Sequence, residues 1–274
     1  MADELINKVD SVPDVTWESL TIPWHREYVS AALTRMIRLG YPEWSIWTLP
    51  LTAHEFGHVV ECKNAELIKF IDEQVARGQS QSHLYDYLGD AFATYTMGPA
   101  YACAAILLRF DPSSAHVDSD ESPAPIKRVH VVFSMLMRLN DKESSMQPYA
   151  GIVEILRTEW NAALLQAAQI SALDDETTKR LDDCVAFMWN FLDPNRRLNP
   201  PNSVSIREWT SKLLEHGGNT IEVYGTEELR DVLNAAWACR VENPTKADAI
   251  KSAAIKLWNL IESKKEIRKG KPTD

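Results

Sequence analysis

The sequence predicts a fold that is all-α or nearly so. Apolar residues recur at helical spacing along most of the 274 residues, and no segment alternates convincingly between apolar and polar residues. Asn-Gly hairpin dipeptides are absent, and runs of β-branched residues are short. We therefore expect a helical core with additional helices in the carboxy-terminal half.

The first predicted helices follow from apolar spacing and from the residues that begin and end them. Apolar side chains recur at helical spacing over residues 24–40, which predicts the first helix. Pro50 places the start of the second helix near Leu51, because proline is tolerated in a first helical turn. Asn64 is a favourable cap for a third helix, and Gly78 ends it.

A long helix is expected over residues 83–109, and Pro99 should kink or divide it. Residues 91–108 contain no charge, which is the lower limit of length for a membrane span. The interruption at Pro99 and the flanking charges of Asp90 and Arg109 favour a buried core helix instead.

The remaining helices are predicted over residues 126–138, 152–170, 177–191, 205–214, 227–239 and 246–261. The acidic segment 111–125 is expected as a mobile loop near the functional site, and the proline-rich segment 193–201 divides the second half. We interpret residues 1–140 as the functional core and residues 141–274 as a helical region packed on it, in one structural unit.

Composition restricts the class of protein. A formal net charge of −10 argues against nucleic acid as a partner, because phosphate binding requires clustered Lys and Arg. The four cysteines are widely spaced and the amino terminus has no signal-peptide pattern, which indicates reduced thiols and a cytoplasmic location without a membrane span.

One short stretch, His54-Glu55-Phe56-Gly57-His58, carries a recognisable chemistry. Histidines four residues apart lie on one face of a helix, so both imidazoles can reach one metal ion. Glu55 can turn toward a water held at that metal. His-Glu-x-x-His is the zincin signature, which predicts Zn²⁺ held by His54 and His58. Gly57 also fits a helix whose backbone passes close to another element.

A catalytic zinc site needs a third protein ligand. Asp86 and Asp90 lie four apart on the next long helix, so one can bind zinc while the other orients a ligand histidine. From the residues alone either aspartate could be the ligand, and His83 is a further candidate. The simpler interpretation of Asp86 and Asp90 is a pair of acids at a helix start, where acids are favoured. However, an uncharged run follows Asp90, and a carboxylate buried there needs a cation or several hydrogen-bond donors.

These motifs resemble those of gluzincin metallopeptidases and, more weakly, of the CAAX prenyl endopeptidases, over about residues 50–135. In both groups Glu-x-x-x-Asp follows His-Glu-x-x-His on a downstream helix. The resemblance implies that Asp86 is the third ligand and that Asp90 orients His54. Asp86 is one methylene shorter than the glutamate of these families, so either the helix comes closer or Asp90 binds the metal.

Residues 122–128 resemble a second block of the prenyl endopeptidases, His-Pro…Arg. The proline and Arg128 match, but Ser122 stands at the histidine position. In that family the arginine supports the site and the histidine steadies the tetrahedral intermediate. The resemblance therefore implies a supporting role for Arg128, with His116 or His130 as the source of the missing donor.

The sequence thus predicts a zinc-dependent metallopeptidase that hydrolyses a peptide bond in a cytoplasmic protein or peptide, as an endopeptidase, with Glu55 as general base. The candidate donors to the oxyanion are Arg128, His116, His130, Tyr95 and Tyr101.

A competing hypothesis from another class is a catalytically silent, zinc-stabilised protein-binding module. The changed third ligand supports this hypothesis, and the intact Glu55 argues against it, because a structural site has no use for a general base. A regulatory protease that cleaves a repressor is a further possibility, although no DNA-binding or sensor segment is visible. The carboxy-terminal helices could bind a regulatory protein partner.

Overall fold

The computed structural model describes residues 20–24, 28–30, 36–40, 45–142, 147–193, 200–203, 208–210, 212–213, 222–223 and 228–269. The chain forms two compact units, Met1–Pro200 and Pro201–Asp274. The fold is nearly all-α, as predicted, with one small sheet in the first unit.

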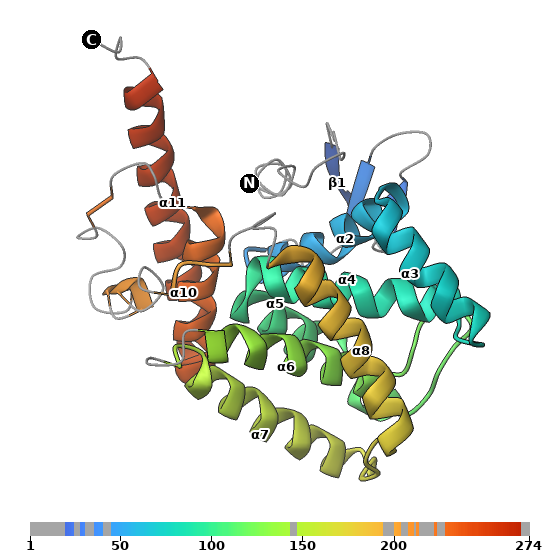
Figure 1. Ribbon diagram of the computed structural model, residues 1–274. Coiled ribbons are helices and arrows are strands. Elements are labelled where there is room, and N and C mark those ends of the chain that lie inside the picture. Colours follow the sequence, from blue (N-terminus) through green and yellow to red (C-terminus); the bar gives the residue numbers. More distant parts are fainter. Residues whose placement is uncertain are drawn as a thin grey trace. The chain divides into compact units, whose positions relative to one another are not determined.

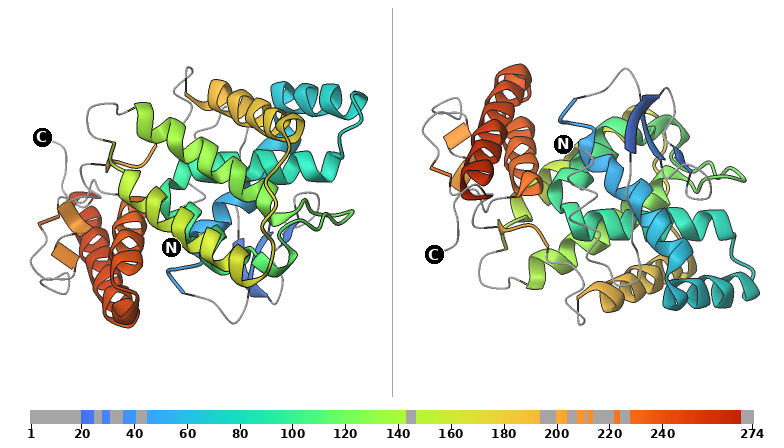
Figure 2. Two further views of the ribbon diagram at one scale, coloured as in Figure 1. Left: turned by 90° about the horizontal axis from the view of Figure 1, so that it is seen from below. Right: turned by 90° about the horizontal axis from the view of Figure 1, so that it is seen from above.

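The first unit contains, in chain order, β1 (Leu20–Trp24), β2 (Tyr28–Ser30), β3 (Met36–Gly40), the 3-10 turn η1 (Leu49–Leu51), α2 (Thr52–Lys63), α3 (Ala65–Ala76), α4 (Gln81–Met97), α5 (Pro99–Ala104), the π-helical turn η2 (Ala105–Arg109), the 3-10 turn η3 (Pro112–Ser114), α6 (Pro125–Lys142), α7 (Ala150–Gln166) and α8 (Asp175–Leu192). Helix α4 packs against α2, α6 and α8, and is the central element of this unit (Figure 1). The same packing can be followed from two other directions in Figure 2.

The helix predicted over residues 24–40 was wrong. The described residues of this region form a three-stranded sheet of order β1-β3-β2, in which β3 pairs parallel to β1 and antiparallel to β2. Short apolar runs fit both the helical and the strand period, and pairing between distant segments decides between them. Pro23 lies in β1, an edge strand of this sheet, where a missing backbone N–H is tolerated.

The later helices largely confirm the predictions. Helix α3 begins at the predicted cap, since Oδ1 of Asn64 accepts hydrogen bonds from the backbone N–H groups of Glu66 (2.9 Å) and Leu67 (3.3 Å). Of the helix predicted over residues 205–214, the structure describes residues 208–210 and 212–213, and these are helical.

The uncharged stretch is divided as predicted and is buried. Gly98, with a φ of 59°, ends α4, and Pro99 begins α5. Every residue from 91 to 106 is buried. Across the described part of the chain, we find no helix that combines the length and the apolar character needed for a bilayer crossing.

The second unit contains α10 (Leu229–Glu242), the 3-10 turn η4 (Pro244–Lys246) and α11 (Ala247–Lys269), and its two helices pack against each other. The boundary between the units lies at the end of the proline-rich segment 193–201 and not near residue 140. Helices α7 and α8 belong to the first unit because α7 packs on α6 and α8 packs on α4 and α6.

Candidate metal centre

Helix α2 presents the motif to the interior of the first unit. It follows η1, which contains Pro50, so its start agrees with the prediction from that proline. His54 and Glu55 are buried, whereas the side chain of His58 is 22% exposed. One histidine is thus enclosed by the fold and the other borders solvent.

Two glycines allow α2 and α4 to approach closely. A Cβ atom at Gly57 would lie 3.0 Å from the Cα of Gly89. A Cβ at Gly89 would lie 3.0 Å from Nδ1 of His54 and 3.3 Å from Cε1 of His58. The expected close approach at Gly57 is therefore confirmed. It also explains how an aspartate, shorter than a glutamate, reaches the histidines from α4.

Three potential ligand atoms converge between these helices. Nε2 of His54 lies 3.3 Å from Oδ1 of Asp86, and Nε2 of His58 lies 4.0 Å from the same oxygen. Ligand atoms about 2.0–2.2 Å from a tetrahedral zinc are separated by about 3.3–3.6 Å, so the distance from His54 already suits one metal ion and the His58 ring would have to move slightly inward. Among the described residues, His54, His58 and Asp86 form the group of His, Cys, Asp and Glu side chains that could hold a metal.

The other nitrogen of each histidine faces a different carboxylate. Nδ1 of His54 lies 2.9 Å from Oδ1 of Asp90, and Nδ1 of His58 lies 3.1 Å from Oε2 of Glu61. An Nδ1–H group that donates to a carboxylate leaves Nε2 as an acceptor, which is the form that binds metals. Both Nε2 atoms then face Asp86.

Asp90 is held by a buried network. Arg128 donates from Nε to Oδ2 of Asp90 (2.7 Å) and from Nη2 to Oδ1 (2.8 Å), and the Tyr101 hydroxyl donates to Oδ1 at 2.5 Å. The cation and the donors that a buried carboxylate requires are therefore present. Arg128 also reaches Asp86, with Nη1 lying 3.5 Å from Oδ2.

These contacts shift the proton affinities of the site. Burial disfavours the charged form of His58, but the Glu61 carboxylate outweighs burial and raises the pKa of His58 to about 9. Burial would raise the pKa values of Asp86 and Asp90, yet the Arg128 guanidinium and His54 hold both well below the usual range. Both aspartates are therefore ionised at neutral pH.

The site has an excess of negative charge. Four buried carboxylates belong to it, those of Glu55, Glu61, Asp86 and Asp90. Two guanidinium groups lie against them, Arg128 beside the aspartates and Arg109 with its Nη2 3.6 Å from Oε1 of Glu55. When the histidines are neutral, two negative charges remain, and a divalent cation would balance them.

A cleft of about 470 Å³ opens onto the site. The lining residues are His54, Glu55, His58, Cys62, Ser82, Tyr85, Asp86, Arg109, Glu121, Ser122 and Arg128. Glu55 therefore shares the cleft with the potential metal ligands. The carboxylate of Glu55 and the guanidinium of Arg109 line this cleft together.

The acidic loop 111–124 borders this cleft through Glu121 and Ser122. The Ser122 hydroxyl, which stands at the histidine position of the prenyl-endopeptidase block, donates to Oδ2 of Asp86 at 2.6 Å. The loop is fastened to α4 by Ser82, whose hydroxyl donates to the carbonyl of Asp120 (2.8 Å). Its predicted position near the site agrees with the structure.

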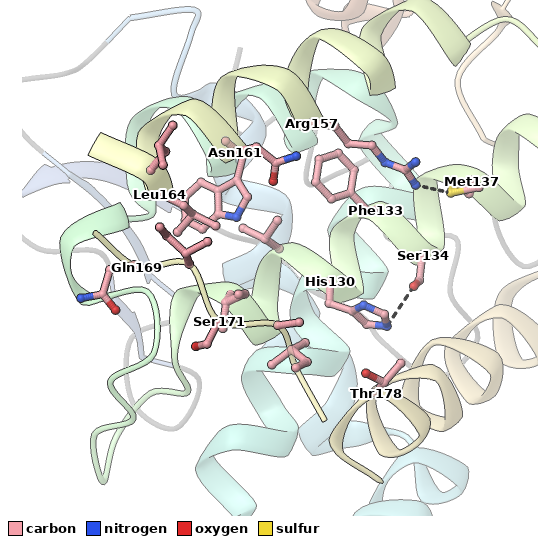
Figure 3. A pocket seen from close by; sticks show the side chains of 17 residues that line it. His130, Phe133, Ser134, Met137, Arg157, Asn161, Leu164, Gln169, Ser171 and Thr178 are labelled. Atoms are coloured by element: carbon pink, nitrogen blue, oxygen red, sulfur yellow. Dashed lines mark hydrogen bonds between the residues drawn. The ribbon is translucent and has the colours of Figure 1, made fainter. Parts of the chain in front are cut away.

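The structure does not bring His116 to the cleft. Nε2 of His116 lies 3.0 Å from the Ser171 hydroxyl, and His116 is not among the lining residues. His130 lies in a separate pocket, where its Nε2 is 3.3 Å from the Ser134 hydroxyl (Figure 3). The same nitrogen is 2.8 Å from Oδ1 of Asp182 on α8. Both candidate replacements for the missing histidine thus lie outside the cleft. His116, in the loop, contacts the segment before α8, and His130, on α6, contacts α8 itself.

His83 and the two candidate tyrosines are also engaged outside the metal-binding group. His83 approaches the carbonyl of Ser119 at 2.7 Å and lines a different pocket. The Tyr95 hydroxyl donates to Asp193, and the Tyr101 hydroxyl donates to Asp90. Of the oxyanion donors that the sequence suggests, Arg128 reaches the cleft.

Sequence reasoning missed the roles of Glu61 and Arg109. Glu61 follows His58 by three residues, so its position on the same helix face was a usable signal. In the sequence, Arg109 marks only the end of the uncharged stretch. In the structure it reaches the cleft from the π-helical turn η2, and single π-helical turns are common at functional sites.

No protein-family model matches this chain, and no curated protein or solved structure matches it either. Its function is therefore inferred from its own residues and their geometry.

Proposed function

We propose that this protein is a zinc-dependent metallopeptidase of the endopeptidase type, acting on a protein or peptide. The observation that carries the proposal is the convergence of His54, His58 and Asp86 beside Glu55 in one cleft. Two imidazoles and one carboxylate are a common donor set of catalytic zinc sites, in which a fourth position is left for water or substrate.

The potential metal ligands, Glu55 and the residues that hold His54 each have a part in this proposal. When bound, zinc would polarise the scissile carbonyl and lower the pKa of water toward about 7. Glu55 accepts the proton of the attacking water and delivers it to the leaving amine. Asp90, fixed by Arg128 and Tyr101, holds the ring of His54 in place.

Arg109 is the best placed donor to the oxyanion that develops on the substrate. Its guanidinium lines the cleft beside Glu55, whereas that of Arg128 is engaged in two hydrogen bonds with Asp90. Arg109 would therefore take the role for which the sequence suggested Arg128, His116, His130, Tyr95 and Tyr101. Such a donor typically contributes about 3 kcal/mol to the stabilisation of the transition state.

The test is cleavage of a peptide library by the zinc-loaded protein and by Glu55→Gln. The substitution keeps the shape of the side chain and removes its basic oxygen, so cleavage should fall by about 10²–10⁴-fold while zinc stays bound. Glu73→Gln, on the exposed surface of α3, is the matched control and should cleave like the wild type.

The binding module is retained as a second candidate because Arg109 lies close enough to Glu55 to form an ion pair with it. A carboxylate neutralised in this way is a weaker base. That candidate predicts zinc binding with no cleavage by either protein, and a cellular phenotype that needs His54 and His58 but survives Glu55→Gln.

A further inference from the structure

Glu61 is the fully buried acid of the site that the proposed mechanism leaves without a role. It lies on α2, three residues after His58, and is 0% exposed. Its Oε2 is 3.1 Å from Nδ1 of His58. Its Oε1 has no hydrogen-bond partner among the described residues.

A carboxylate in this position is costly. Transfer of a charged group from water to the interior is unfavourable unless counter-charges and donors compensate. Glutamine or an apolar side chain would avoid most of that cost. A fold that keeps the carboxylate therefore needs a cation nearby.

The comparison with Asp90 identifies what Glu61 lacks. Each carboxylate faces Nδ1 of one histidine, Asp90 at His54 and Glu61 at His58. Arg128 neutralises Asp90 through two hydrogen bonds. Among the described residues, the ion-pair partner of Glu61 is His58 itself, and no guanidinium or ammonium group contacts it.

We infer that Glu61 is a positioning residue for the metal ion: it holds Nδ1–H of His58 so that Nε2 faces Asp86, and its carboxylate, whose ionic partner among the described residues is His58, is balanced by the bound cation once a metal occupies Nε2. The inference rests on the proposed metal site. It adds that the two histidines are held by carboxylates of different character: Asp90 is paired with a guanidinium, whereas Glu61 is paired with the ligand histidine itself.

The experiment measures zinc and cobalt affinity of the full chain by competition with a chelator. The variants are Glu61→Met, which removes the acceptor and the charge, and Glu61→Gln, which keeps an acceptor oxygen and removes the charge. Glu73→Gln, whose side chain is 51% exposed on α3, is the control for loss of one acid. Circular dichroism and the unfolding transition of the metal-free proteins report whether each variant folds.

We expect Glu61→Met to weaken zinc binding by about 10–100-fold, Glu61→Gln to weaken it by less, and Glu73→Gln to leave it unchanged. The visible spectrum of bound cobalt should change in Glu61→Met, because His58 is no longer oriented; a merely structural role would leave that spectrum as it is. If Glu61→Met does not fold, Glu61→Gln alone tests the role of the charge.

The outcomes separate this inference from the proposal on which it rests. A wild-type protein that binds no zinc overturns the metal site itself. A wild type that binds zinc, with both Glu61 variants binding equally well and giving the same cobalt spectrum, overturns the role of Glu61 alone. Equal affinity in Glu61→Gln with a loss in Glu61→Met would contradict the role of the charge.

Discussion

The two aspartates of the candidate site differ in their exposure and in the side chains that contact them. Asp90 is 0% exposed and carries the pair with Arg128, while the side chain of Asp86 is 12% exposed and faces the cleft. Asp90→Asn should destabilise the metal-free protein by about 3–5 kcal/mol, because it removes the carboxylate that accepts both short hydrogen bonds of the buried Arg128 guanidinium and leaves it only the longer contact with Asp86. Urea unfolding measures this cost.

Asp86→Asn should destabilise the protein less than Asp90→Asn does, and it should remove zinc more completely. Losing a carboxylate that only orients a ligand histidine typically weakens metal binding by about 10–100-fold, whereas Asp86 is proposed to bind the metal itself. Zinc retained by Asp86→Asn but lost by Asp90→Asn would reverse the assignment of the third ligand.

Proton release from His58 sets the pH dependence of metal binding. With a pKa of about 9, the imidazole carries a proton at neutral pH that a metal must displace from Nε2. Zinc affinity should therefore rise with pH, by up to about tenfold per unit, and this gain should end near pH 9. Calorimetry in buffers of different ionisation enthalpy counts the protons released. An affinity independent of pH over about pH 6–9 would contradict this prediction.

For single residues, the sequence was most informative where the candidate site depends on local spacing. One helix carries His54, Glu55 and His58, and another carries Asp86 and Asp90. The helical repeat alone therefore placed the residues of each group on one face. Arg109 could not be found in this way. Its place beside Glu55 depends on the turn η2 and on the packing of α5, which no local pattern specifies.

At the scale of elements, the crossing of α2 and α4 sets the width of the proposed metal site. In Gly89→Ala the new Cβ would lie 3.0 Å from Nδ1 of His54, so the ring or the helix must move. We expect a marked loss of zinc affinity, measured by chelator competition.

Gly151→Ala on α7 is the matched control, because a Cβ there meets no atom within 4 Å. It should bind zinc normally and gain about 0.5–1 kcal/mol of stability, the usual benefit of alanine over glycine in a helix. Gly89→Ala that binds zinc as well as Gly151→Ala would show that the close approach is not required.

The elements were predicted with unequal success. Helices with clear end signals agreed with the structure, as at the Asn64 cap and the Gly98-Pro99 break. The strands β1 to β3 did not, because their short apolar runs also fit a helix and their partners are distant in sequence.

For the whole molecule, the proposed site belongs to one unit. All its residues, from His54 to Arg128, lie within Met1–Pro200. A chain that ends at Pro200 should therefore bind about one zinc with the affinity of the full chain. Equilibrium dialysis checks this, and a shortened chain that folds but binds no zinc would show that the second unit contributes to the site. Helical patterns in the sequence did not predict the boundary between the two units, because such patterns continue on both sides of it.

The most direct test of the account is the position of the metal. Anomalous X-ray diffraction at the zinc edge, from crystals of the zinc-loaded protein, should give a single peak about 2.0–2.2 Å from Nε2 of His54, Nε2 of His58 and an Asp86 oxygen. Asp90 and Glu61 should remain on the two Nδ1 atoms. A peak bonded to Asp90 or to Nδ1, or no peak between α2 and α4, would contradict the proposed centre.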